Sequence, residues 1–132
     1  MERARIEAWV ARYERAWRTA GTEPLADLFT EDASYRMSPY SEPVVGLRRI
    51  AKLWDAQRQG PDEIFAMTSE IVAVDGDTAV VRVEIKYGEP VEREYRDLWL
   101  IRFADERRAS AFEEWPFWPG QPLAAPSGSV EH

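Results

Sequence analysis

Two acidic residues, Asp97 and Glu114, stand in otherwise apolar segments of the C-terminal half of the chain. Asp97 lies within EYRDLWLIRF and Glu114 within AFEEWPFWPG. A turn at residues 104–107 would pair these segments and place Asp97 opposite Glu114, with Cβ atoms about 5 Å apart. Two ionised carboxylates at that separation repel each other, so the pair needs a shared proton or a basic partner. A shared proton raises at least one pKa toward neutrality, which suits a general acid or base.

The same two carboxylates also fit a purely structural role. Acidic side chains near strand ends often form ion pairs, and Arg36, Arg96 and Arg108 are available as partners. The sequence leaves a catalytic pair and a structural ion pair open as alternatives.

The two strands that carry the carboxylates are apolar on both faces. Because side chains alternate along a strand, this pairing predicts one face toward a pocket and one toward the outside. The pocket face holds Tyr95, Asp97, Trp99, Ile101, Phe112 and Glu114, and the outer face holds Leu98, Leu100, Ala111, Glu113, Trp115 and Phe117. A homodimer packed through its sheets is the simplest cover for the outer face. A register slip of one residue would exchange the two sets.

Composition excludes several classes of chemistry. The chain has no cysteine, and its one histidine is the last residue, His132, so thiolate ligands, an imidazole-based metal site and a Ser-His-Asp triad are not expected. We therefore expect no metal and no cofactor. The net charge of -7 opposes binding to nucleic acid. The charged N-terminus and the absence of a long apolar run predict a cytoplasmic protein with no membrane segment.

The periodicity of apolar residues predicts one α+β domain. Helical spacing indicates a first helix over residues 5–20, a short second helix over residues 22–29 and a third from Leu47 until Gly60 and Pro61 stop it. A short strand is expected over residues 33–37. Alternating residues on either side of Asp75-Gly76-Asp77 predict a hairpin, and two further strands follow it.

Three stretches of the sequence together resemble one family. They are LADLFTEDASY, SPYSEPVVGLRRIAKLW and AFEEWPFWPG, at the separations expected for the SnoaL-like branch of the nuclear transport factor 2-like superfamily. The resemblance runs from about residue 5 to residue 119. It implies a cone-shaped domain, in which three N-terminal helices pack on a strongly curved, mainly antiparallel sheet and enclose a pocket. We assign residues 1–119 to this domain and expect residues 120–132 to be a flexible tail.

The pocket implied by the resemblance would be lined by aromatic side chains. We expect its lining to include Tyr13, Trp17, Tyr35, Tyr40, Trp54, Phe65, Tyr95, Trp99 and Phe112. Such a pocket suits a small hydrophobic ligand. One hypothesis is cofactor-free acid/base catalysis of the isomerase, cyclase or dehydratase type, with Asp97 as base, Glu114 as its proton partner and a tyrosine as oxyanion donor. The alternative is a non-catalytic ligand-binding or dimeric structural module.

Overall fold

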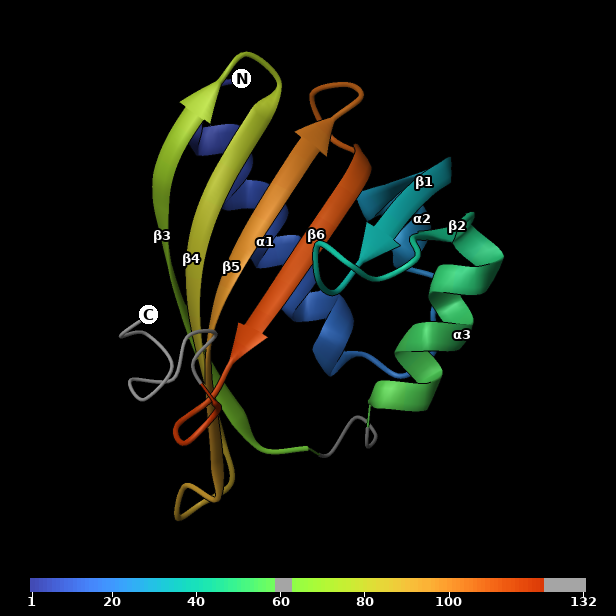
Figure 1. Cartoon of the computed structure of the whole chain (residues 1–132). Helices are drawn as coiled ribbons and strands as arrows, with labels where there is room; N and C mark the ends of the chain where they lie inside the picture. Colours follow the sequence, from blue (N-terminus) through green and yellow to red (C-terminus); the bar gives the residue numbers. More distant parts are fainter. Residues whose placement is uncertain (59–62, 123–132) are drawn as a thin grey trace, which may run out of the picture.

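The computed structural model describes residues 1–58 and 63–122. Three helices and six strands follow one another along the chain (Figure 1). They are α1 (Arg3–Arg18), α2 (Leu25–Leu28), β1 (Phe29–Arg36), β2 (Val44–Val45), α3 (Leu47–Gln57), β3 (Phe65–Asp75), β4 (Thr78–Tyr87), β5 (Arg93–Phe103) and β6 (Ala109–Phe117). The stop expected at Gly60 and Pro61 and most of the expected tail, residues 123–132, lie outside the described residues.

The six strands form one sheet in the order β2-β1-β6-β5-β4-β3. All neighbouring strands are antiparallel except β1 and β6, which are parallel. The sheet bends, and α1 lies across one of its faces (Figure 1). The predicted α+β cone fold is therefore confirmed. The very short strand β2, which pairs with β1, was not anticipated because it contains only two residues.

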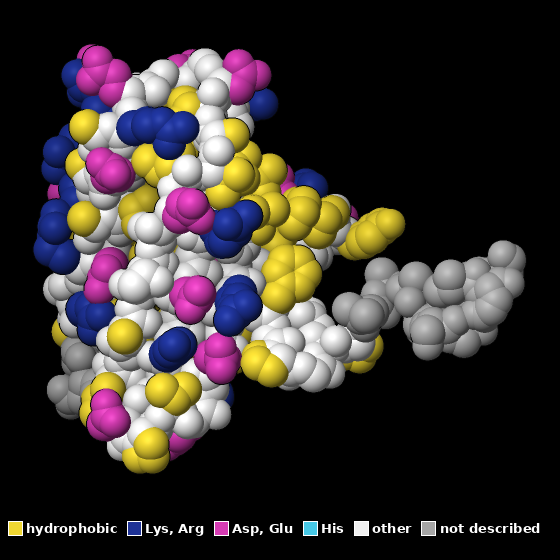
Figure 2. All heavy atoms as spheres, turned by 90° about the vertical axis from the view of Figure 1, so that its left-hand side faces the viewer, with side chains coloured by type: hydrophobic (Ala, Val, Ile, Leu, Met, Phe, Trp, Pro, Cys, Tyr) yellow, Lys and Arg dark blue, Asp and Glu magenta, His cyan; other side chains and the backbone are white. Residues whose placement is uncertain are grey.

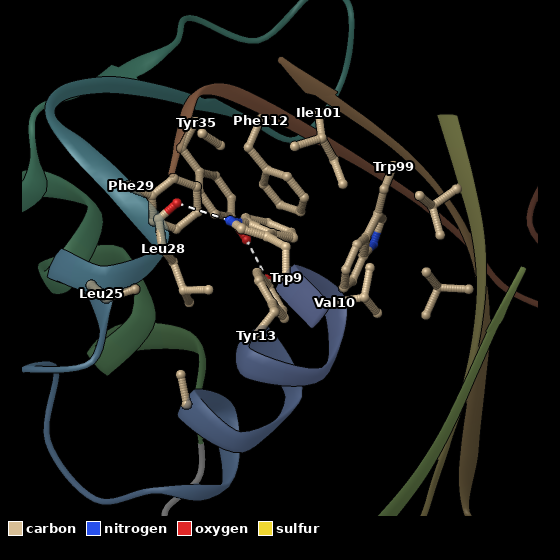
Figure 3. Packing of buried hydrophobic residues seen from close by; sticks show 14 of the residues in the cluster. Trp9, Val10, Tyr13, Leu25, Leu28, Phe29, Tyr35, Trp99, Ile101 and Phe112 are labelled. Atoms are coloured by element: carbon tan, nitrogen blue, oxygen red, sulfur yellow. Dashed lines mark hydrogen bonds between the residues drawn. The ribbon is translucent and has the colours of Figure 1, made fainter. Parts of the chain in front are cut away.

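Helix α1 fills the inner face of the sheet because one side of it is apolar. Ile6, Trp9, Val10, Tyr13 and Ala16 are its buried residues, and their spacing is that of one helical face. Trp9 is fully buried, and its Nε1 donates a hydrogen bond to the backbone oxygen of Leu28 at 2.9 Å. Figure 3 shows the Trp9 ring in the middle of the core, with the side chains of the sheet around it.

The end of α1 is tied to the end of α3 by Arg58. Its guanidinium donates to the backbone oxygens of Ala16, Thr19 and Gly21, the last two at 2.8 Å. These carbonyls lie at and just beyond the end of α1, where few backbone donors remain and Ala16 also accepts from the N–H of Thr19. Arg58 thereby fixes the end of α1 that carries Trp17.

The pairing of β5 with β6 differs from the sequence prediction. Asp97 lies opposite Pro116, and Glu114 lies opposite Trp99, so the register expected for the carboxylates is wrong by two residues. One residue of this shift arises because the turn is longer than expected. In the turn, the carboxylate of Asp105 accepts hydrogen bonds from the backbone N–H groups of Arg107 and Arg108 at 2.8 and 2.7 Å. The second residue of the shift arises from a bulge between the pairs of Phe103 and Arg102.

The two shifts preserve the faces of the strands. A total displacement of two residues returns every side chain to its expected side. Asp97, Trp99, Ile101 and Phe112 are buried on the inner face, with Glu114 partly buried beside them. On the outer face, Leu98, Leu100, Ala111 and Trp115 are partly exposed.

Candidate active site

A pocket opens between α1 and the inner face of β3 to β6. Its inner end is a cavity of about 30 Å³, enough for about one water molecule, lined by Tyr13, Trp17, Phe65, Met67, Ile85, Tyr87, Trp99 and Glu114. Its outer part is a cavity of about 310 Å³, lined by Trp17, Met37, Gln57, Glu63, Ile85, Tyr87, Arg93, Tyr95, Asp97, Glu114, Pro116 and Trp118. The two parts share Trp17, Ile85, Tyr87 and Glu114, and we refer to them together as the cone pocket.

Asp97 and Glu114 lie side by side at the junction of the two parts. Asp97 is only 3% exposed and lines the outer part, whereas Glu114 lines both. The two residues occupy neighbouring rungs of β5 and β6, diagonally rather than directly opposite. Each carboxyl group influences the pKa of the other, and a hydrogen bond between them would require a proton on one of them.

Burial favours a proton on the carboxyl pair, and most strongly at Glu114. Burial, followed by the hydrogen bond and the charge of Asp97, raises the pKa of Glu114 well above its ordinary value. Burial also raises the pKa of Asp97, but hydrogen bonds from Glu114 and Trp99 act in the opposite direction. The pKa values of both carboxyl groups are therefore raised, which favours a proton on the pair.

The hydrogen bonds around the pair support this assignment. Trp99 Nε1 donates to Asp97 Oδ2 at 3.3 Å. The other oxygen, Oδ1, is buried and has no hydrogen-bond partner among the side chains and backbone groups that the structure describes. A proton on Glu114 would satisfy that oxygen, and an unsatisfied buried carboxylate oxygen is costly.

Two buried tyrosines extend the hydrogen-bonded chain into the core. The Tyr35 hydroxyl donates to Glu114 Oε1 at 2.8 Å, and the hydroxyls of Tyr13 and Tyr35 are 3.0 Å apart. Because Tyr35 uses its proton on Glu114, Tyr13 is the donor in the second bond. The contact between the two tyrosines is drawn in Figure 3. Burial and then the charge of Glu114 raise the pKa of both tyrosines, which keeps them neutral.

No arginine neutralises the carboxyl pair within residues 1–58 and 63–122. Of the three arginines considered as partners, Arg108 pairs with Asp105, Arg36 donates to the backbone oxygen of Pro39, and Arg96 is exposed. The structural ion pair that the sequence left open is therefore absent from this part of the chain. Burial without a counter-charge is what keeps a proton on the pair.

Most of the residues expected around the pocket do meet there. Tyr13, Trp17, Phe65, Tyr95 and Trp99 line it directly. Three others lie behind the lining: Tyr35 holds Glu114, while Trp54 and Phe112 pack against the ring of Tyr13 with centroid distances of 5.1 and 5.4 Å.

Tyr40 is not part of the pocket. Its side chain is fully exposed, so the expectation that it points inward is wrong. The reason lies in a local turn, in which the backbone N–H of Ser41 donates to the oxygen of Ser38 and the two serine hydroxyls lie 2.7 Å apart. This turn directs Tyr40, one of the two residues between the serines, into solvent.

The sequence prediction missed several residues of the mouth. Tyr87 and Arg93 have the same strand parity as the buried residues of β4 and β5, so extending the alternation to the strand ends would have found them. Glu63, Met37, Gln57 and Trp118 lie outside the central strands, and no periodic signal identifies them.

The described residues contain no group of three or more potential metal ligands from histidine, cysteine, aspartate and glutamate. The same part of the chain has no helix that is long and apolar enough to cross a membrane.

The sequence model of the SnoaL-like domain family matches residues 10–111, which is most of the chain. The chain belongs to the SnoaL-like family. The resemblance of the three sequence stretches is thus confirmed. No curated protein matches the sequence.

Solved structures with this SnoaL-like fold include proteins named after two kinds of enzyme. A candidate ketosteroid isomerase from Kribbella flavida DSM 17836 superposes with a TM-score of 0.67 and 19% identity, covering 98% of this chain and 90% of that one. A ketosteroid isomerase-like protein from Erwinia carotovora atroseptica SCRI1043 gives a TM-score of 0.61 and 23% identity, with coverages of 88% and 96%. A candidate SnoaL-like polyketide cyclase from Jannaschia sp. CCS1 gives 0.64 and 15%, with coverages of 82% and 84%. At these identities the similarity establishes the fold alone.

Proposed function

We propose that this protein binds a small apolar carbonyl compound in the cone pocket and transfers a proton next to the carbonyl group. The observation that carries the proposal is the pair of carboxyl groups of Asp97 and Glu114 in an aromatic pocket, where Asp97 is buried and no described arginine pairs with either. The names of the structural neighbours, ketosteroid isomerase and polyketide cyclase, agree with chemistry of this kind. Isomerase, cyclase and dehydratase reactions all contain such a step.

Each carboxyl group has a separate role in the proposed reaction. The Asp97 carboxylate removes a proton from the carbon next to the carbonyl, since it lines the outer part of the pocket and carries the negative charge. Glu114 donates a hydrogen bond to the carbonyl oxygen as negative charge develops there. In that state the ligand oxygen replaces Asp97 as the acceptor of the Glu114 proton.

Tyr35 is a positioning residue in this scheme. It donates to Glu114 Oε1, so it fixes the orientation of the carboxyl group whose other oxygen carries the proton. The sequence hypothesis of a tyrosine acting directly on the oxyanion is thereby modified, because the protons of Tyr13 and Tyr35 are already used within the chain of hydrogen bonds.

The test is deuterium incorporation from D₂O into the α-position of α-tetralone, a flat aromatic ketone, followed by proton NMR. Wild-type protein should accelerate the exchange, and Asp97→Asn should abolish it because the base is lost while the side-chain shape is kept. Asp75→Asn, at the exposed end of β3, is the matched control and should exchange like wild type. Equal exchange by Asp97→Asn and wild type would remove Asp97 as the base. Binding of α-tetralone without exchange in either protein would favour the non-catalytic ligand-binding module.

We also propose that the protein forms a homodimer through the outer face of β5 and β6. Leu98, Leu100, Ala111, Trp115 and Phe117 lie on this face, and Phe117 is 50% exposed. Figure 2 shows hydrophobic side chains gathered along the border that faces the viewer in Figure 1, which is the side of the sheet opposite α1. Exposed apolar side chains on a sheet face suit an interaction site, and sedimentation velocity measures whether this face joins two copies.

A further inference from the structure

Three side chains form the outermost rung of the cone pocket. Tyr87 of β4 lies opposite Arg93 of β5 on one side and Phe65 of β3 on the other. Glu63 precedes β3 by two residues, and it lines the mouth together with Tyr87 and Arg93. Arg93 is the one cationic side chain among the residues that line the pocket within the described chain.

The surroundings of Arg93 orient it without neutralising it strongly. Its guanidinium carbon lies 4.5 Å from the centre of the Tyr87 ring, an arrangement that favours a cation above an aromatic face. Its Nη2 is 3.4 Å from Glu63 Oε2, the one ion pair that it makes with a described residue. The Glu63 side chain is only 10% exposed, but the contact is long and made by one nitrogen of a side chain that is 43% exposed, so the pair holds Arg93 weakly.

A guanidinium held in this way can accept a better partner. Arginine remains protonated at all relevant pH values and presents a planar set of N–H donors that matches a carboxylate with two parallel bonds. A ligand carboxylate making both bonds would therefore compete successfully with the single contact from Glu63. One guanidinium charge also matches a singly charged carboxylate better than a doubly charged phosphate.

The distance from Arg93 to the carboxyl pair defines the length of such a ligand. Arg93 and Asp97 are four residues apart on β5 and share the inner face, which corresponds to about 13 Å along the strand. Between them the pocket is lined by Ile85 and Tyr95, and Tyr87 lies beside Arg93. These side chains suit an apolar middle section.

We propose that Arg93 is a specificity-determining residue that binds a carboxylate at the far end of the substrate, so that the natural ligand is an oxo acid with an apolar middle. This inference rests on the proposed function, because it places the carbonyl end of the ligand at Asp97 and Glu114. It adds the chemical class of the substrate and the residue that selects it.

The experiment compares 9-oxodecanoate with its methyl ester by isothermal titration calorimetry. The two probes differ only at the end remote from the ketone, where the ester replaces the carboxylate charge by a methyl group. Wild-type protein should bind the acid about tenfold more tightly than the ester, the size expected for one charge-assisted contact. Arg93→Gln should bind both probes equally. Arg96→Gln, an exposed arginine three residues along β5, should retain the wild-type preference.

Glu63→Gln provides a second, independent prediction. Removing the competing carboxylate should raise the affinity for the acid by about threefold and leave the ester unaffected. Equal affinities for the acid and the ester in wild type, with no effect of Arg93→Gln, would overturn the role of Arg93 and leave the cone pocket as a ligand site. If neither probe binds, the pocket itself is not a site for apolar carbonyl compounds, and the inference fails with the proposed function.

Discussion

Replacing Tyr35 by phenylalanine tests the hydrogen-bonded chain that holds Glu114. The substitution removes one hydroxyl group and keeps the ring contacts with Phe29 and Phe112, whose centroids lie 6.1 and 5.0 Å away. The lost hydroxyl donates to Glu114 at 2.8 Å and accepts from Tyr13 at 3.0 Å, so two buried hydrogen bonds disappear together. At about 1 kcal/mol each, the free energy of unfolding should fall by about 2 kcal/mol.

The loss should increase with pH. The hydrogen bond from Tyr35 lowers the pKa of Glu114, because it stabilises the ionised form more than the neutral one. While Glu114 is neutral the bond is an ordinary one. Once Glu114 ionises, the bond becomes charge-assisted and its contribution rises to about 2 kcal/mol. The total cost of Tyr35→Phe should then approach about 3 kcal/mol.

The measurement is urea unfolding of wild type and variant at a series of pH values from 5 to 9. Tyr13→Phe is the matched control, because it removes the bond between the tyrosines and leaves the one from Tyr35 to Glu114. Its cost should be about 1 kcal/mol and nearly constant with pH. A cost of Tyr35→Phe that equals that of Tyr13→Phe at every pH would refute the hydrogen bond to Glu114 and the orientation it provides.

Two further changes probe the pair and the outer face. Because burial raises the pKa of Glu114, the folded protein keeps a proton that the unfolded chain releases, so wild-type stability falls as pH rises from the ordinary carboxyl range through the raised pKa. Glu114→Gln should remove this fall. Its free energy of unfolding, measured with urea, should exceed that of wild type at high pH by about 1.4 kcal/mol for each unit by which the pKa is raised. Parallel pH dependences of the two proteins would contradict a proton on Glu114. Leu98→Lys, on the proposed dimer face, should convert a species of twice the 15.2 kDa chain mass into monomer in sedimentation velocity. Val72→Lys, on the exposed surface of β3, is the control and should stay dimeric, and a monomeric wild type would rule out the proposed interface.

The elements of the fold were predictable because they depend on local periodicity. The buried face of α1 repeats at helical spacing, and the hairpin of β3 and β4 turns at the expected Asp-Gly step. The order of the strands in the sheet was harder to predict from the sequence, since the parallel pairing of β1 with β6 joins residues far apart in the chain. The family resemblance implied a strongly curved, mainly antiparallel sheet, and neither it nor the residue pattern identified this parallel pair.

The site was predicted in outline and missed at its edges. Alternation alone groups Asp97 with Trp99 on β5 and Glu114 with Phe112 on β6, whereas the turn between the strands decides that the two groups share a face. Tyr40 could not be placed, since a turn closed by Ser38 and Ser41 decides its direction. Arg93 is the first residue of β5 and lines the pocket, but it was not predicted to do so because a charged residue at a strand end is usually assigned to solvent.

Asp97 and Glu114 were correctly placed on the same face although their predicted register was wrong by two residues. The turn from Ala104 to Arg108 is one residue longer than expected, and the bulge near Ser110 adds another. Either change alone would have placed Asp97 and Glu114 on opposite faces of the sheet, because side chains alternate with a period of two. Together they keep both carboxyls inside and move them from a directly opposed to a diagonal arrangement. The candidate site therefore depends on residues that never touch it, Asp105, which closes the turn, and Ser110, which the bulge leaves unpaired.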